Sequence, residues 1–158
     1  MPAIAFNTPV DKRYFEDYVP GSIHEFGSIV VTEKEIVDFA SHYDPQVFHV
    51  NSKAARRTTF GGLIASGWHT AAVANRLIID HFLSHVASLG SPGADELRWF
   101  KPVRPGDALS VRVIVTETRR SQSRPDRGII RSVVEVMNQD HDIVMSWKGL
   151  NFLLCRNT

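Results

Sequence analysis

Alternating hydrophobic and polar positions in the C-terminal part of the chain predict β-strands. Between residues 108 and 118, leucine or valine occupies every second position from Leu109 to Val115, so one face of a strand there would be better buried. Three further segments are rich in β-branched and aromatic residues and are separated by turn-forming residues. The four predicted strands are residues 96–100, 108–118, 128–138 and 142–154. Consecutive strands joined by short turns predict an antiparallel sheet.

A different spacing, typical of helix, precedes these strands. After a short strand expected over residues 21–31, Thr32 and Glu35 form the T-x-x-E pattern of a helix capping box. Apolar residues then recur every three or four positions, which predicts an amphipathic helix. Pro45 disfavours helical geometry at the residue before it, so this helix is expected to end near Asp44.

The longest helical candidate is the segment 63–90. It is apolar over much of its circumference, as expected for a helix surrounded by other parts of the structure. Such a helix needs a sheet face to cover it, so the order strand, helices and four strands predicts an α+β fold. Because no linker, internal repeat or low-complexity tract interrupts the sequence, we expect residues 1–158 to form one domain.

The composition indicates a protein of the reducing cytoplasm. A chain of 158 residues can bury about two thirds of the surface that its unfolded form exposes, so it does not need a disulfide framework. Its single cysteine, Cys155, cannot form an intrachain disulfide. No charged-then-apolar leader is present at the start, and no apolar run approaches the roughly 18 residues that span a bilayer. We therefore expect neither secretion nor a membrane partner.

The charge balance argues against nucleic acid as a partner. Lys and Arg total 18 against 17 Asp and Glu, a formal net charge of +1, whereas nucleic-acid-binding domains are strongly basic. One local exception is RRSQSRPDRG (residues 119–128), which holds four arginines. Its Pro, Ser and Gly content favours a solvated hairpin loop. The alternative is a contact with the phosphate groups of a ligand.

An aspartate and a histidine stand five positions apart where the predicted helix ends. In YDPQVFHV (residues 43–50) the segment that joins Asp44 to His49 contains Pro45 and is too short for another full helix, so it can fold back and bring its ends together. A carboxylate beside an imidazole is suited to general acid–base chemistry at neutral pH. The plainer interpretation is that Asp44 caps a backbone turn and that a nearby carbonyl group satisfies His49.

A second candidate feature is ASGW (residues 65–68), near the expected start of the long helix. Small residues there leave the backbone N–H groups sterically approachable, and the positive end of the helix dipole favours negative charge. A developing oxyanion could bind at this position. The alternative is that Gly67 only allows close packing of the helix on the sheet.

Taken together, these motifs resemble the MaoC-like dehydratase family, which includes the (R)-specific enoyl-CoA hydratases. The resemblance covers about residues 20–154 and is carried by four stretches: DFASHYDPQVFHVNSKAA, FGGLIASGWHTAAV, LRWFKPVRPGD and VVEVMNQDHDIVMSW. It implies a hot-dog fold, in which an antiparallel sheet wraps around one long central helix. It also implies a homodimer or a higher homo-oligomer.

The same resemblance implies a reaction, the reversible hydration of a trans-2-enoyl-CoA to an (R)-3-hydroxyacyl-CoA. Asp44 and His49 match the hydratase motif and would hold the attacking water. Gly67 matches the glycine whose amide binds the oxyanion. No cofactor is implied, because CoA is part of the substrate.

The chain departs from the best-known hydratases close to this site. Many have His-Gly-Met where this sequence has Ser66, Gly67 and Trp68, and Asn75 stands where they carry a serine. We predict that Ser66, Trp68 and Asn75 contact the substrate, with the acyl-chain preference left open. Trp68 could narrow an acyl pocket, and the alternative for it is simple packing in the core.

Other functions fit the same architecture. An acyl-CoA thioesterase is one, because a fold does not fix a reaction, and a non-catalytic subunit that binds acyl-CoA is another. His81 and His85 would share a helix face, but a pair falls short of the three or four ligands usual for zinc, so no metal is predicted. In the turn expected at residues 101–107, Lys101 or Arg104 could approach a CoA phosphate.

Overall fold

The computed structural model describes residues 5–157. In chain order the elements are η1 (Val10–Lys12), η2 (Phe15–Asp17), β1 (Ile23–Val30), α1 (Glu33–Tyr43), α2 (Val47–Val50), α3 (Ser52–Ala55), α4 (Gly67–His81), β2 (Ala94–Trp99), β3 (Ala108–Arg120), β4 (Arg127–Met137) and β5 (Ile143–Leu154), where η marks a short 3₁₀-helix. Each predicted strand corresponds to an observed one, with ends that differ by a few residues.

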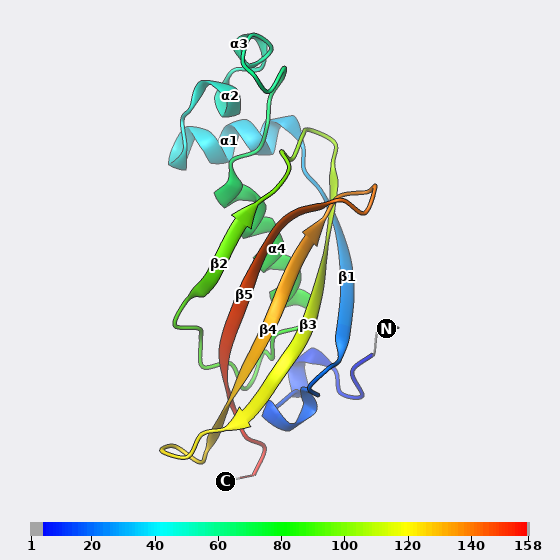
Figure 1. Cartoon of the computed structure of the whole chain (residues 1–158), viewed down its shortest axis with the longest axis vertical. Coiled ribbons are helices and arrows are strands. Elements are labelled where there is room, and N and C mark those ends of the chain that lie inside the picture. The colour runs from blue at the N-terminus through cyan, green and yellow to red at the C-terminus, as the bar shows by residue number, and fades with distance from the viewer. Residues whose placement is uncertain (1–4, 158) are drawn as a thin grey trace.

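One antiparallel sheet organises the molecule. Its strand order is β1-β3-β4-β5-β2. Figure 1 shows α4 lying against one face of this sheet, with α1, α2 and α3 gathered at one end and the β3–β4 turn projecting at the other. This arrangement is a hot-dog fold of the α+β class, as the sequence predicts.

The hydrophobic core lies between α4 and the facing side of the sheet. Along β3, every second residue from Leu109 to Val115 is buried, which confirms the predicted alternation. Ala74 and Leu77 of α4 are buried against this face. Because a slip of one residue would turn the whole apolar set outward, this burial fixes the register of the sheet.

The first long helix begins and ends where the sequence predicts. Thr32 Oγ1 accepts a hydrogen bond from the Glu35 N–H (3.2 Å), and Glu35 Oε2 accepts one from the Thr32 N–H (3.0 Å), so the capping box is formed. α1 ends one residue before Asp44, whose φ of −156° is no longer helical. The steric effect of Pro45 on the preceding residue accounts for this ending.

The central helix is shorter than the sequence predicts. The expected segment 63–90 is helical only from Gly67 to His81. Before α4 the chain is extended, because the Ala65 N–H donates to the carbonyl of Val103 (2.8 Å) in the loop before β3. Apolar periodicity continues through these residues, but it cannot reveal such a partner.

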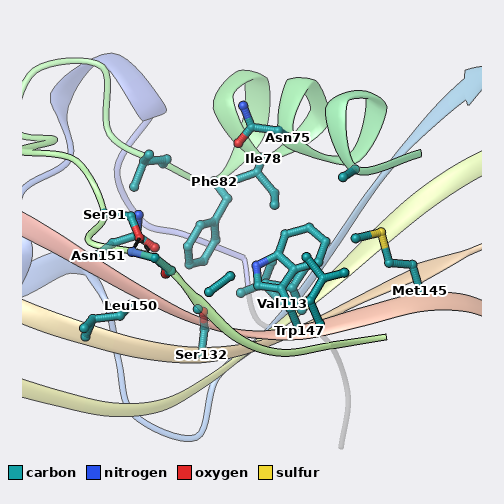
Figure 2. Close-up of a pocket in the computed structure, with 17 residues that line it drawn as sticks. Asn75, Ile78, Phe82, Ser91, Val113, Ser132, Met145, Trp147, Leu150 and Asn151 are labelled. Carbon is teal, nitrogen blue, oxygen red and sulfur yellow. Dashed lines mark hydrogen bonds between the residues drawn. The ribbon is translucent and has the colours of Figure 1, made fainter. Parts of the chain in front are cut away.

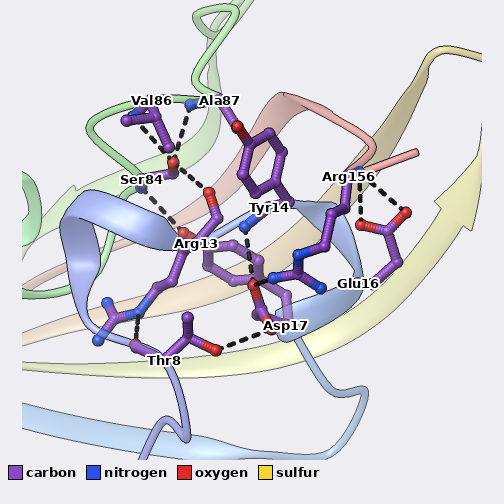
Figure 3. Close-up of polar contacts among 10 residues, drawn as sticks. Thr8, Arg13, Tyr14, Glu16, Asp17, Ser84, Val86, Ala87 and Arg156 are labelled. Carbon is purple, nitrogen blue, oxygen red and sulfur yellow. Dashed lines mark hydrogen bonds and ion pairs between the residues drawn. The ribbon is translucent and has the colours of Figure 1, made fainter. Parts of the chain in front are cut away.

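Residues of the N-terminal segment bind the end of α4 and the turn after it, and Figure 3 shows the contact between Arg13 and Ser84 in that turn. Arg13 Nη1 donates to the carbonyl oxygens of His81 (2.7 Å) and Phe82 (3.1 Å), which lie at the C-terminal end of the helix. The Tyr18 hydroxyl also donates to the Phe82 carbonyl (2.8 Å), and burial raises the pKa of Tyr18 to about 12. Ser84 Oγ in turn donates to the Arg13 carbonyl (2.6 Å). The chain leaves the helix here because these partners hold it in another conformation.

The predicted pairing of His81 and His85 on one helix face is wrong, because α4 ends at His81. His85 lies in the following turn, where its Nε2 is 2.6 Å from the carbonyl oxygen of Ile79. Within residues 5–157, no three His, Cys, Asp or Glu side chains are grouped so as to hold a metal ion. In the same part of the chain, no helix is long and apolar enough to cross a membrane.

The arginine-rich segment 119–128 is a hairpin turn, as predicted. It joins β3 to β4, and the Ser121 N–H donates to the Arg127 carbonyl (2.9 Å). Figure 1 places this turn at the end of the sheet opposite α1, α2 and α3. Its arginines therefore lie far from any ligand that binds beside those helices.

Candidate active site

Asp44 and His49 are brought together by a tight turn between α1 and α2. After α1 ends, the Gln46 N–H donates to the Asp44 carbonyl (2.8 Å), and the His49 N–H then donates to the Gln46 carbonyl (2.9 Å). This path folds the chain back on itself, as the presence of Pro45 predicts. Asp44 Oδ2 and His49 Nε2 lie 3.4 Å apart.

The His49 ring is held by its other nitrogen. Nδ1 lies 2.7 Å from the carbonyl oxygen of Ile64, and the residue is only 5% exposed. A carbonyl oxygen can only accept, so Nδ1 carries the proton that joins them. In the neutral ring, Nε2 is then a hydrogen-bond acceptor that faces Asp44.

The Asp44 carboxylate is fixed through both of its oxygens. The Ser66 hydroxyl donates to Oδ2 (2.7 Å), and Gln46 Nε2 donates to Oδ1 (2.7 Å). The hydrogen bond from Ser66 is the main reason why the pKa of Asp44 lies below its usual range, while partial burial opposes this shift and Gln46 and His49 reinforce it. Asp44 is therefore a carboxylate at neutral pH.

Ser66 supports Asp44 from behind, which corrects the prediction that it contacts the substrate. The residue is 0% exposed. Besides donating to Asp44, its hydroxyl accepts from the Trp68 N–H (3.3 Å) and so forms the N-cap of α4. The hydroxyl thus links the start of the helix to the carboxylate, with no surface left for a ligand.

Gly67, the first residue of α4, combines the two roles that the sequence left open. A Cβ atom added to it would lie 2.4 Å from Cε2 of Trp99, so glycine is required for the close packing of this helix against β2. The Trp99 Nε1–H donates to the Gly67 carbonyl (3.0 Å). Among residues 5–157 the Gly67 N–H has no acceptor, as is usual for the first amides of a helix. It therefore remains available to a ligand oxygen.

Asp44, His49 and Gly67 line one cavity of about 490 Å³. Five of the fifteen residues that line it are large aromatic ones: Phe48, Phe60, Trp68, Trp99 and Phe100. A carboxylate, an imidazole and a backbone amide thus line one cavity together with aromatic side chains. A few polar groups among apolar ones is the usual composition of a small-molecule site.

Trp68 lies on the wall of this cavity and not in the core. It is 58% exposed, and its ring meets that of Trp99 edge to face at 5.0 Å. The alternative of simple core packing is therefore wrong for Trp68. Lys101 also lines the cavity, but its ammonium group is paired with Asp142.

Asn75 is not brought close to Asp44 and His49. It lies two turns further along α4 and lines a second cavity of about 390 Å³ between that helix and the sheet (Figure 2). The structure therefore separates Asn75 from Asp44 and His49, and a contact with substrate there would need a ligand that reaches this second cavity.

Two further residues of this site, Gln46 beside Asp44 and Trp99 beside Gly67, have no signal in the sequence. Gln46 lies within the turn itself, where a glutamine has no special spacing. Trp99 is 32 positions from its partner Gly67. Trp99 is an exposed aromatic residue at the end of a strand, and nothing local in the sequence indicates that it faces the helix.

Known proteins resemble this chain along most of its length. The family described as "MaoC like domain" matches residues 19–137. The uncharacterized protein YdeM of Bacillus subtilis is 28% identical over 124 residues, which cover 78% of this chain and 86% of that protein.

Solved structures agree with this match. The MaoC-like dehydratase from Rhodospirillum rubrum has a TM-score of 0.85 and 36% identity, over 92% of this chain and 99% of that one. The R-hydratase PhaJ1 from Pseudomonas aeruginosa has a TM-score of 0.70 at 22% identity, over 92% of this chain and 86% of that one. At that level of identity the second similarity shows the fold alone.

Proposed function

This chain belongs to the MaoC-like dehydratase family, and from that membership we propose that it is a hydro-lyase. The proposed reaction is the reversible addition of water to a trans-2-enoyl-CoA, which gives an (R)-3-hydroxyacyl-CoA. The stereochemistry follows from the (R)-hydratase type that the sequence motifs resemble. No cofactor takes part, since CoA is carried by the substrate.

One observation supports this function best: two hydrogen-bond acceptors and one free amide donor face the same cavity. The acceptors are His49 Nε2 and the Asp44 carboxylate, with 3.4 Å between Nε2 and Oδ2. A water molecule that donates one hydrogen to each acceptor turns its lone pairs toward the cavity. Gly67, whose N–H has no acceptor among residues 5–157, lines the same cavity.

These groups match the demands of hydration. Water attacks C3 of an enoyl thioester only if the thioester oxygen can accept the charge of an enolate. The Gly67 N–H at the start of α4 would bind that oxygen, and a well-aimed donor of this kind contributes about 3 to 4 kcal/mol. As the C3–O bond forms, a water proton passes to the Asp44–His49 pair, and a proton returns from the pair to C2. The atoms of one water are thereby added across the double bond.

We further propose a homodimer or a higher homo-oligomer. Trp68, Trp99 and Phe100 at the rim of the cavity are 58%, 44% and 60% exposed in the single chain. A second copy that covers them would remove a contiguous aromatic surface from water. Measurement of the mass in solution by light scattering tests this, and a monomer at micromolar concentration would contradict it.

The decisive experiment replaces each member of the pair. We expect His49→Ala and Asp44→Ala to fold like the wild type but to lose about 10² to 10⁴-fold in crotonyl-CoA hydration, the usual contribution of general acid–base groups. One assay should follow 3-hydroxyacyl-CoA, free CoA and ligand binding together. Release of free CoA would instead identify a thioesterase, and binding without turnover would identify a non-catalytic acyl-CoA-binding subunit. Full turnover in either variant would rule out the mechanism.

A further inference from the structure

Two of the cavities are lined by residues on one face of α4. Gly67 lines the catalytic cavity, and Ala71, Asn75 and Ile78 line the second one. These positions are spaced by four, four and three residues, so they form one stripe on the helix. At 1.5 Å per residue, Ala71 is about 6 Å along the helix from Gly67.

Trp99 lines the catalytic cavity and is next to residues that line the second cavity. Its indole covers Gly67, since a Cβ at that glycine would touch the ring, and it is tied there by the hydrogen bond from Nε1 to the Gly67 carbonyl. Trp99 lines the catalytic cavity, whereas Leu97 of the same strand lines the second. Met145, which pairs with Trp99 across the sheet, also lines the second cavity. The residue two positions before Trp99 and its partner on the neighbouring strand thus both line the second cavity.

The second cavity has the chemistry of a site for an uncharged chain. Figure 2 shows Phe82, Val113 and Trp147 around its interior. Its polar lining includes the amide of Asn151 and the hydroxyl of Ser132, and no Asp, Glu, Lys or Arg of residues 5–157 contributes to it. An alkyl chain would gain by entering this space, whereas a carboxylate would lose its hydration without finding a cation.

We propose that Trp99 sets the length of the acyl group, by closing the catalytic cavity toward the space between α4 and the sheet. This inference rests on the proposed function, because it assumes an acyl thioester bound at Gly67. With Trp99 in place, the cavity accepts short 2-enoyl groups. Without the indole, a longer chain follows the stripe from Gly67 past Ala71 into the second cavity.

The test compares crotonyl-CoA with trans-2-octenoyl-CoA through the ratio of their kcat/KM values. In Trp99→Ala this ratio should rise in favour of octenoyl-CoA by at least about tenfold, because each methylene that enters apolar surroundings contributes about fourfold. Trp99→Phe keeps an aromatic ring over Gly67 but lacks the N–H group, so its ratio should change much less. Trp99→Leu provides the same comparison in case the alanine variant does not fold.

A second substitution checks the route. Ala71→Leu narrows the entrance of the second cavity and should return the ratio of the Trp99→Ala enzyme toward the wild-type value. In the wild-type background Ala71→Leu should leave the ratio unchanged, because the indole already closes that entrance. If Ala71→Leu does not lower the ratio in the Trp99→Ala enzyme, the acyl chain leaves the catalytic cavity by another path. That result overturns the proposal.

Failure of this inference and failure of the proposed function give different results. Suppose that the wild type hydrates crotonyl-CoA, and that Trp99→Ala and Trp99→Leu have the same ratio of kcat/KM values for the two substrates as the wild type. Trp99 then does not set the length of the acyl group. If the wild type hydrates neither substrate, the hydratase proposal is wrong, and calorimetric binding of butyryl-CoA and octanoyl-CoA still tests Trp99. A gain in octanoyl-CoA affinity in Trp99→Ala would support the closing role, and equal affinities in the two proteins would overturn it.

Discussion

The two ends of α4 are built in opposite ways. At the C-terminal end the terminal carbonyl groups are satisfied by buried donors, with Arg13 Nη1 at 2.7 Å from His81 O and the Tyr18 hydroxyl at 2.8 Å from Phe82 O. Arg13 is 7% exposed and Tyr18 is 2% exposed, so these donors are shielded from solvent. Its hydrogen bonds connect the helix to the N-terminal segment and stabilise the fold.

At the N-terminal end of α4 the groups are left open. The Gly67 N–H has no acceptor among residues 5–157, and Ser66 uses its hydroxyl to fix Asp44 as well as to cap the helix. The neighbouring Trp68 remains 58% exposed. Under the proposed function, one helix then serves two purposes: satisfied polar groups stabilise the fold at one end, and unsatisfied groups are left to bind the substrate at the other.

The largest effect in this comparison is expected at Gly67. In Gly67→Ala the new methyl group would meet the indole of Trp99 at 2.4 Å, so either the ring or the first turn of α4 must move. Displacement of an oxyanion donor typically costs about 10² to 10³-fold in kcat, and crotonyl-CoA hydration measures it. Gly62→Ala is the matched control, because its methyl would meet only the flexible end of Arg104 at 3.3 Å. Unchanged kcat in Gly67→Ala would show that this amide takes no part.

At the other end of the helix, the expected effect is on stability and not on turnover. Arg13→Leu removes the donor that satisfies the carbonyl of His81 and should lower the free energy of unfolding by about 2 to 4 kcal/mol, since buried acceptors would lose charged partners. Urea denaturation measures the loss, and kcat per folded molecule should stay near that of the wild type. The exposed Arg119 of the β3–β4 turn serves as control, and Arg119→Ala should change stability by less than about 0.5 kcal/mol. Equal losses of unfolding free energy in Arg13→Leu and Arg119→Ala would contradict the stabilising role of the C-terminal end of α4.

The smallest effect is expected from the link between the helix and the carboxylate. Ser66→Ala removes the hydrogen bond that is the main cause of the lowered pKa of Asp44. If ionised Asp44 is required, the rate falls as the pH drops through this pKa, so the acid limb of the kcat profile should move to higher pH in the variant. Loss of the N-cap should also lower the free energy of unfolding by about 1 kcal/mol.

Ser66→Thr keeps the hydroxyl and is the control for this shift. The acid limb of the kcat profile of Ser66→Thr should coincide with that of the wild type. The same denaturation experiment compares the stability of the two proteins. An acid limb that does not move in Ser66→Ala would mean that Asp44 is not the group whose ionisation controls the rate.

Much of the fold could be predicted because its signals are local. The alternation from Leu109 to Val115, the capping box at Thr32 and the effect of Pro45 each act within a few residues of the chain. The approach of Asp44 to His49 belongs to the same class, since a short turn alone joins them. In each case the backbone preference of a few neighbours is enough to determine the local structure.

The extent of α4 was not predictable in this way. Residues 63–90 are apolar throughout most of their length, so their periodicity does not mark either end of the helix. The ends are decided by hydrogen bonds from distant segments, from Ala65 to Val103 at the start and from Arg13 to His81 at the finish. The second contact joins residues 68 positions apart.

By itself, then, the sequence determined the α+β architecture, the approach of Asp44 to His49 and the glycine at the start of the helix, because short-range periodicity and turn chemistry specify them. The tertiary structure alone decided that Ser66 lies behind Asp44, that Trp99 covers Gly67 and that Asn75 lines a different cavity. Those contacts connect residues far apart in the chain, and their partners are selected by the packing of α4 on the sheet, which no local pattern records.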